Sequence, residues 1–271
     1  MTIKSPGQVA NGLSSGDAHI VVDGLTMKYG ERIVQQDLSF TVNRQDIFVI
    51  MGGSGCGKST LLKHMIGLYK PAEGDILVDN LSLYRSSLLE RQKLLRQFGI
   101  TYQAGALITS LTLAENVGMP LELYTTLSQA DINELVALKL AMVGLSGFES
   151  YYPSEISGGM IKRAALARAL ALDPEILFFD EPSAGLDPVS ARRLDDLIIE
   201  LSESMSATIV LVSHELASIF AIANNSVFLD AATQTMLATG HPQTLLDSCP
   251  LAAVQRFLTR GNAESLVEKA Q

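Results

Sequence analysis

The sequence has no tryptophan, only two cysteines and no apolar run that approaches the roughly 18 residues needed for a membrane-spanning helix. Without such a run the chain is not expected to cross a membrane, so any membrane association must go through a partner protein. The cysteines, Cys56 and Cys249, provide no disulfide framework. This cysteine usage fits a reducing cytosol.

Basic residues are also scarce. The chain has 20 Lys and Arg against 29 Asp and Glu, a net charge of −9. Because nucleic-acid surfaces need clustered basic side chains, this balance argues against a nucleic-acid partner.

The 271 residues, 47% of them hydrophobic, suit one large domain or a domain with a subdomain. Residues 1–18 are polar, lack the apolar core of a signal peptide and are predicted to form a flexible arm.

A complete phosphate-loop pattern, G-x-x-x-x-G-K-[ST], stands between an apolar run at 47–51 and a helix-forming stretch at 60–66. Glycines let backbone N–H groups turn toward phosphate oxygens, and the helix N-terminus adds a partial positive charge. Lys58 is expected to reach the β- and γ-phosphates, and the Ser59 hydroxyl to ligate Mg²⁺. The residues predicted to hold a nucleoside triphosphate here are Gly52, Gly53, Ser54, Gly55, Cys56, Gly57, Lys58, Ser59 and Thr60.

The rest of the chain alternates between strand and helix patterns, which predicts an α/β sheet with crossover helices. Between about 111 and 172 the signals are helical, with Ser128 and Asp131 as a capping box and a helix from Ser157 that ends before Asp173. A last helix is predicted at 251–258. Strands are expected at 19–22, 40–42, 47–51, 73–78, 100–102, 176–179 and 208–212.

Two acids, Asp180 and Glu181, follow the apolar run at 176–179. Parallel sheets bind ligands at the carboxyl ends of their strands, so these acids are expected at the nucleotide. Asp180 would hold Mg²⁺ through water, and Glu181 would orient and polarise the attacking water. A strand that ends in a solvated acidic turn is the alternative, and the phosphate loop upstream favours the catalytic interpretation.

Two further polar residues follow predicted strands. His214 comes after the strand at 208–212, where it would sense the γ-phosphate. Gln103 follows the strand at 100–102, where its amide would touch Mg²⁺ and the attacking water. Each also fits an ordinary position, because histidine is usually a surface or satisfied core residue and glutamine at a strand end is common.

Ser157, Gly158 and Gly159 precede a helix. They fit an ordinary N-cap with flexible glycines, but a serine and two bare amides at a helix N-terminus also form a second anion site. One chain then carries two phosphate-binding surfaces. A two-fold dimer would use both phosphate-binding surfaces, because each chain's Ser157 would cover the nucleotide on the other chain's phosphate loop.

These motifs, in this order over residues 19–240, resemble the nucleotide-binding subunit of an ABC transporter. The resemblance implies an α/β P-loop fold with a RecA-like core (19–103 and 171–240), a helical subdomain (104–170) and a C-terminal extension (241–271). It also implies ATP hydrolysis with Mg²⁺, adenine stacking on Tyr29 and a nucleotide contact from Asp187. The matching segments are Gly52–Ser59, Gln103, Ser157–Gly159, Asp180–Glu181, Ala184–Asp187 and His214.

Within that family the segments 102–107, 157–163 and 181–188 resemble the ATPases of Mla-type, MCE-associated phospholipid transport systems. Met160 is usual in that subfamily, whereas Ile156 departs from the wider family and Ile108 stands where the subfamily often has Phe. The resemblance implies a peripheral subunit on the cytoplasmic face of the inner membrane, with a permease at Gln103–Thr112 and an MCE-type lipid-binding protein.

Two alternatives remain from the sequence. The chain is also similar to ATPases of small-solute importers, against which only the segment at 104–117 argues. A soluble ABC protein acting on ribosomes or DNA is the other alternative, but such relatives usually carry two cassettes or long coiled-coil insertions. This chain has one cassette and a short insertion at 104–170.

Overall fold

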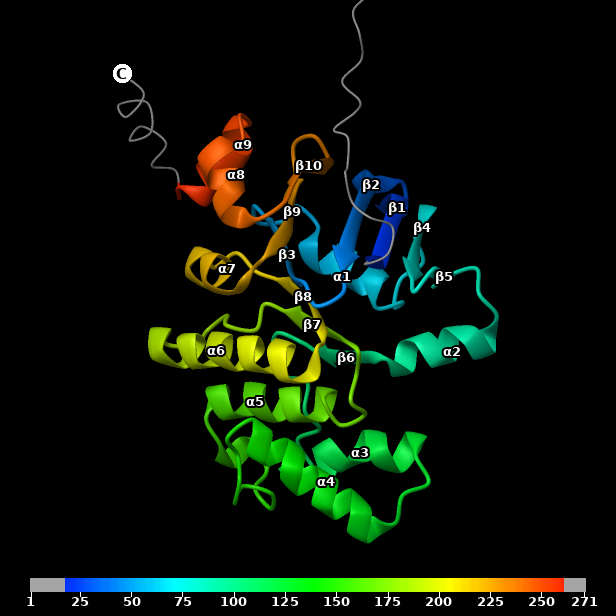
Figure 1. The fold of residues 1–271 in the computed structure, drawn as a ribbon, viewed down its shortest axis with the longest axis vertical. Helices are drawn as coiled ribbons and strands as arrows, with labels where there is room; N and C mark the ends of the chain where they lie inside the picture. Colours follow the sequence, from blue (N-terminus) through cyan, green and yellow to red (C-terminus); the bar gives the residue numbers. More distant parts are fainter. Residues whose placement is uncertain (1–17, 261–271) are drawn as a thin grey trace, which may run out of the picture.

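The computed structural model describes residues 18–260 (Figure 1). A six-stranded sheet runs through its middle in the order β10-β9-β3-β8-β7-β6. All neighbours pair in parallel except β10, which is antiparallel to β9. The strands are β3 (Ile47–Gly52), β6 (Phe98–Thr101), β7 (Ile176–Asp180), β8 (Thr208–Val212), β9 (Asn225–Asp230) and β10 (Thr235–Thr239).

A second, antiparallel sheet packs against the first and has the order β2-β1-β4-β5. The sequence predicted three of these strands, β4 with its full bounds and β1 and β2 in shorter form, but not that they build a sheet of their own. Phe40 of this sheet stacks on Phe48 of β3, with ring centroids 5.3 Å apart. The strands are β1 (Ala18–Tyr29), β2 (Arg32–Asn43), β4 (Glu73–Val78) and β5 (Leu81–Ser82).

Helices cover both faces of the six-stranded sheet, and α3, α4 and α5 lie together at one end of the molecule (Figure 1). Ser87, Thr112 and Ser128 each begin a helix with a reciprocal capping box. The helices are α1 (Lys58–Met65), α2 (Leu88–Arg96), α3 (Leu113–Tyr124), α4 (Gln129–Met142), α5 (Gly158–Ala169), α6 (Pro188–Met205), α7 (Leu216–Ile222), α8 (Pro242–Ser248) and α9 (Ala252–Leu258), with a 3₁₀ turn at Pro153–Glu155.

The predicted capping of α4 by Ser128 with Asp131 is confirmed, and α5 begins after Ser157 as expected. The strand predicted at 100–102 spans Phe98–Thr101 instead, and β9, β10 and α8 were not predicted. The proposed boundaries of core, helical subdomain and extension remain predictions. The expected flexible arm lies almost entirely outside the described residues.

One apolar core continues from the six-stranded sheet into the helical end. Val117 of α3 and Val136 of α4 belong to the same buried cluster as Leu166 of α5, Phe179 of β7 and Ile198 of α6. The opposite face of the sheet forms a separate cluster with α1 and the antiparallel sheet. Within residues 18–260 no helix combines the length and apolar character that a membrane crossing requires.

His19 links the two sheets. Its Nδ1 lies 2.7 Å from the Thr208 hydroxyl oxygen of β8, and Arg44 pairs with both Asp79 and Glu175 beside it. Burial lowers the pKa of His19, so the contact with Thr208 joins neutral groups at pH 7. This network anchors the start of β1, the strand that ends at the nucleotide cleft.

Candidate active site

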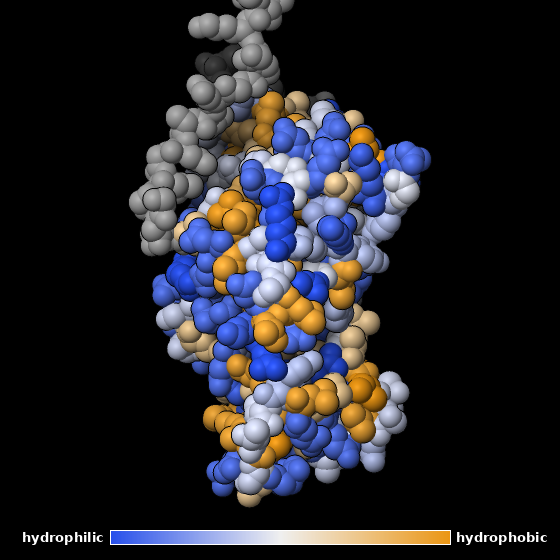
Figure 2. Space-filling model, turned by 90° about the vertical axis from the view of Figure 1, so that its right-hand side faces the viewer, coloured by the Kyte–Doolittle hydropathy of each residue, from blue (hydrophilic) through white to orange (hydrophobic). Residues whose placement is uncertain are grey.

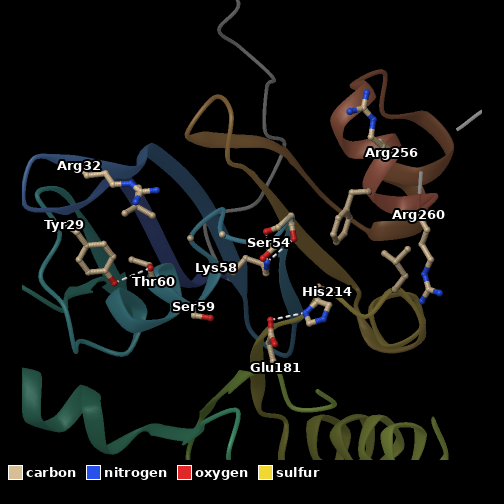
Figure 3. Close-up of a pocket in the computed structure, with 17 residues that line it drawn as sticks. Tyr29, Arg32, Ser54, Lys58, Ser59, Thr60, Glu181, His214, Arg256 and Arg260 are labelled. Carbon is tan, nitrogen blue, oxygen red and sulfur yellow. Dashed lines mark hydrogen bonds and ion pairs between the residues drawn. The ribbon is translucent and has the colours of Figure 1, made fainter. Parts of the chain in front are cut away.

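A cleft of about 790 Å³ opens over the phosphate loop (Figure 3). Tyr29 stands on one side, Lys58 and Ser59 lie at the floor, and Glu181 and His214 come from the ends of β7 and β8. Strands β3, β8 and β7 are parallel neighbours, so their carboxyl ends meet at one edge of the sheet. The register of the sheet therefore brings residues 58, 181 and 214 together across long stretches of chain.

The phosphate loop is folded around the Lys58 ammonium. Its Nζ donates to Gly52 O at 3.0 Å and to Gly53 O at 2.9 Å. Gly52 has a φ of 149°, and a Cβ there would lie 2.3 Å from Leu229 O, so this position requires glycine. The loop thus has the backbone form that admits phosphate oxygens, with a cation beside them.

Gln35 of β2 supports the loop from beneath, a role that no sequence signal indicated. It is fully buried, and its amide donates to Cys56 O at 2.7 Å and to Asp230 O at 2.9 Å. The Cys56 side chain is 1% exposed, and burial raises the pKa of its thiol. Cys56 was predicted to bind nucleotide, but its side chain faces the interior, which leaves only its backbone near the cleft.

Ser59 and Asp180 form an oxygen pair that fits Mg²⁺. The Ser59 hydroxyl donates to Asp180 Oδ1 at 2.9 Å. Burial raises the pKa of the Asp180 carboxyl, and the bond from Ser59 works in the opposite direction. A bound divalent cation would favour the charged carboxylate, and oxygen ligands of this kind are what Mg²⁺ prefers. Gln103 is the third residue predicted to bind the metal. Within the described residues its side-chain amide donates a hydrogen bond to Glu181 and not to Ser59 or Asp180.

The three predicted catalytic side chains form one cluster. His214 Nδ1 lies 3.0 Å from Glu181 Oε1, and Gln103 Nε2 donates to Glu181 Oε2 at 3.3 Å. Glu181 has a φ of 48°, uncommon for a residue with a side chain, and its N–H donates to Val212 O at 3.0 Å. A carboxylate held this way beside a phosphate loop is placed to orient a water and accept its proton.

Tyr29 presents an aromatic face to the cleft at the end of β1 (Figure 3). The side chain is half exposed. Its hydroxyl oxygen lies 3.4 Å from the Thr60 hydroxyl oxygen. Its ring packs edge-on against the Tyr69 ring, with the ring centroids 6.1 Å apart. This geometry orients the ring for stacking with a purine base.

The predicted residues Ser157, Gly158, Gly159 and Asp187 do not line this cleft. Ser157 caps α5, accepting from Met160 N at 3.3 Å, and with Gly159 it lines a separate cavity of about 370 Å³. Asp187 caps α6 through the N–H groups of residues 189 and 190, and hydrogen bonding from the Ser190 side chain first, then from these N–H groups, lowers the pKa of its carboxyl. Within one chain these four residues therefore lie outside the cleft that contains the phosphate loop.

The wall opposite Tyr29 comes from the C-terminal part of the chain (Figure 3). The helix α9 was predicted, but its position at the cleft was not, since neither periodicity nor spacing indicates which helix faces a distant loop. The lining residues that the sequence did not single out are Arg32, Val34, Leu216, Arg256, Phe257 and Arg260.

Comparison with curated proteins gives long matches. The intermembrane phospholipid transport system ATP-binding protein MlaF of Haemophilus influenzae is 40% identical over 236 residues, covering 87% of this chain and 89% of that protein. MlaF of Escherichia coli K12 is 38% identical, with 84% of each chain covered. The probable ribonucleotide transport ATP-binding protein mkl of Mycobacterium tuberculosis is 42% identical, but the match spans 73% of this chain and 55% of mkl.

Two solved structures resemble the fold. The ATP-binding cassette MJ0796, a dimer in a post-hydrolysis state with ADP and Pi, has a TM-score of 0.74 and 29% identity, covering 82% of this chain and 98% of that one. The chain cbiO1 of Clostridium perfringens, part of the transporter complex cbiONQ, has a TM-score of 0.78 at 24% identity, covering 92% and 99%.

Residues 35–184 match the ABC transporter family. This match, the curated relatives and the shared fold agree with one another and confirm the predicted P-loop ATPase architecture. The chain belongs to the ABC transporter family, among its ATP-binding proteins.

Proposed function

We propose that this chain is the ATP-hydrolysing subunit of a phospholipid transporter, and that two copies enclose two ATP molecules. The observation that carries the proposal is the Glu181 carboxylate, held by His214 and Gln103 beside the phosphate loop. The phospholipid cargo rests on the resemblance to MlaF, which is named for intermembrane phospholipid transport.

In the proposed reaction the adenine stacks on Tyr29 and the phosphates lie in the loop, where Lys58 exchanges its bonds to two carbonyl oxygens for bonds to phosphate. Ser59 and Asp180 would hold Mg²⁺, which would neutralise phosphate charge. Glu181 orients the water that attacks the γ-phosphorus, the bond to the β–γ bridging oxygen breaks, and ADP and phosphate leave. His214 and Gln103 keep the carboxylate aimed at that water.

The separation of Ser157 from the cleft supports the two-fold arrangement. In a dimer the α5 N-terminus of one copy covers the phosphate loop of the other, and its N–H groups and hydroxyl bind the γ-phosphate. Loss of that phosphate removes the group that bridges the two copies, so they separate after hydrolysis. The dimeric state of the MJ0796 cassette, which holds ADP and Pi, is consistent with this cycle.

Ser157→Ala is expected to leave ATP binding by the isolated chain unchanged and to slow hydrolysis roughly tenfold, as the loss of a charge-assisted hydrogen bond implies. The decisive measurement uses mixed dimers of a Ser157→Ala chain and a Lys58→Ala chain. If each site is shared between copies, one intact site forms and the mixed dimer hydrolyses ATP faster than either variant alone. A mixed dimer that is no faster than the Ser157→Ala variant would refute the shared site.

Ser128→Ala is the matched control, because Ser128 caps α4 with the same backbone conformation and likewise accepts from the N–H three residues further on. Both substitutions cost about 1 kcal/mol of helix capping. Only the Ser157 variant should hydrolyse ATP more slowly than the parent.

We further propose that a permease docks at the face formed by α2 and α3. A groove of about 420 Å³ lies there, lined by Leu95, Phe98, Met119 and Tyr124 among others. Exposed apolar side chains gather on this face (Figure 2). Arg168 lines the groove and donates to the carbonyls of residues 105 and 106, so the groove adjoins the segment Gln103–Thr112. The complex would lie on the cytoplasmic face of the inner membrane and include an MCE-type lipid-binding protein.

Purification of the tagged chain from its native membrane tests the cargo. A multi-spanning permease and bound phospholipid, identified by mass spectrometry, are the expected result. Ribonucleotide in place of lipid would favour the activity for which mkl is named, and absence of any membrane protein would contradict the transporter proposal. Tyr124→Ser should lose the permease, whereas Leu138→Ser on α4 should retain it; both side chains are 54% exposed.

A further inference from the structure

Three side chains that can ligate a metal ion converge where the two sheets meet. His19 lies near the start of β1, Asp79 lies in the turn between β4 and β5, and Glu175 directly precedes β7. One ligand atom from each lies within 4.8 Å of the other two. His19 Nε2 is 3.9 Å from Asp79 Oδ2 and 4.0 Å from Glu175 Oε2. None of the three lines the cleft over the phosphate loop, so the cluster is separate from the nucleotide site.

The imidazole of His19 has a buried nitrogen without a partner. The side chain is 1% exposed, and within residues 18–260 its Nε2 forms no hydrogen bond. Its Nδ1 lies 2.7 Å from the Thr208 hydroxyl oxygen, which also accepts from Gln45 N–H at 2.9 Å. When Nδ1–H donates to that hydroxyl, the Nε2 lone pair faces two carboxylates, and three acceptors meet. One water molecule can donate to only two of them, whereas a cation satisfies all three.

Backbone contacts hold the three donors in this arrangement. Asp79 N–H donates to His19 O at 3.1 Å, and Thr208 N–H donates to Glu175 O at 3.0 Å. Thr208 therefore holds both the His19 ring and the backbone of Glu175. Metal-binding histidines usually have their second ring nitrogen fixed in this way, which sets the tautomer and the ring orientation. A tetrahedral zinc site separates neighbouring ligand atoms by about 3.4 Å, so the two distances from Nε2 need to shorten by only about 0.5 Å.

Arg44 occupies the outer side of the cluster. It pairs with Asp79 Oδ1 and, at 3.4 Å, with Glu175 Oε2. Burial lowers the pKa of His19 and keeps its imidazole neutral, so two carboxylates face one guanidinium and a net negative charge remains. The Arg44 side chain is half exposed and lines a cavity of about 280 Å³ together with His19 and Glu175. This cavity gives an ion a path to the cluster and gives the guanidinium room to turn away.

We propose that His19, Asp79 and Glu175 bind one Zn²⁺ ion, with a water molecule as the fourth ligand. Arg44 would turn toward solvent as the ion enters. One neutral imidazole and two carboxylates suit Zn²⁺, whereas Mg²⁺ and Ca²⁺ prefer oxygen ligands alone. The ion would join the start of β1, the β4–β5 turn and the segment before β7, and so fasten the antiparallel sheet to the six-stranded one. It requires neither nucleotide nor a second copy of the chain.

The test titrates Zn²⁺ into the full-length chain, without a histidine tag and after removal of metal by a chelator. Calorimetry should show that the parent binds one equivalent more than Asp79→Asn or Glu175→Gln, and excess Mg²⁺ should not displace it. Free Zn²⁺ about a hundredfold above its Kd should raise the Tm of the parent by about 5–10 °C. Asp37→Asn is the matched control and should behave like the parent, because Asp37 is an exposed aspartate with the same left-handed φ, 50° against 49° at Asp79.

Arg44→Gln distinguishes this site from zinc bound elsewhere on the surface. Removal of the competing guanidinium should tighten Zn²⁺ binding about tenfold. Both amide substitutions keep the shape of partly exposed side chains, and if either variant does not fold, the other carries the test. Absence of Zn²⁺ binding by the parent, or an unchanged stoichiometry in a folded Asp79→Asn or Glu175→Gln variant, would overturn the proposal. Weaker binding by Arg44→Gln would also overturn it, because the ion would then not take the place of the guanidinium.

Discussion

Glu181→Gln is expected to lower ATP turnover by roughly 10²–10⁴-fold, the usual contribution of a group that takes a proton in the reaction. The amide has the same shape as the carboxylate, so contacts with His214 and Gln103 are largely kept and ATP binding survives. Without hydrolysis the γ-phosphate continues to join the two copies. Phosphate release measures the turnover, and size-exclusion chromatography in ATP should show a stable dimer.

Glu215→Gln is a suitable control for this variant. Glu215 lies on the other side of the same imidazole, 3.8 Å from His214 Nε2, and the substitution removes an equal charge. Its turnover should stay close to that of the parent. Hydrolysis by Glu181→Gln at the parent rate would show that the assigned role of Glu181 is wrong.

Lys58→Ala is expected to weaken nucleotide binding by about 10–100-fold, since a hydrogen bond from a charged group contributes about 1.5–3 kcal/mol. The substitution removes the only cation that bonds to the loop carbonyls within the described residues, so the loop also loses its internal support. Titration with a fluorescent ATP analogue measures the affinity, and transport in cells should fall with it.

Lys70→Ala serves as the control here, because Lys70 is an exposed lysine outside the cleft. It should bind nucleotide and support transport like the parent. Transport retained by Lys58→Ala would count against ATP as the energy source for this system.

The sequence predicted the residues that gather in the cleft because each follows a buried apolar strand. A strand such as 176–179 is recognisable from its composition, and parallel strands place their carboxyl ends at one edge. Asp180, Glu181 and His214 could therefore be assigned to one site before any contact was known. The structure brings them to that site with Lys58 and Ser59.

Other features could not be predicted, because they depend on contacts between distant segments. Gln35 holds the loop from a strand of the antiparallel sheet, and a lone glutamine in a strand carries no signal. The inward side chain of Cys56 depends on how the loop packs on its surroundings. Strands β9 and β10 were missed because the segments 225–230 and 235–239 contain apolar runs of only three residues, against four in 176–179 and 209–212, so their strand signal is weaker and tertiary pairing determines them.

The continuous apolar core has a consequence for excised fragments of this protein. The helices of residues 104–170 bury Val117, Val136 and Leu166 in the same cluster that contains Phe179 beneath the sheet. Cut free, such a fragment would present that surface to water, where each large aliphatic side chain loses about 1.5–3 kcal/mol of burial. Residues 104–170 are therefore not expected to survive as an autonomous piece, and grafting them onto a foreign cassette would require transplanting the strand surface on which they rest.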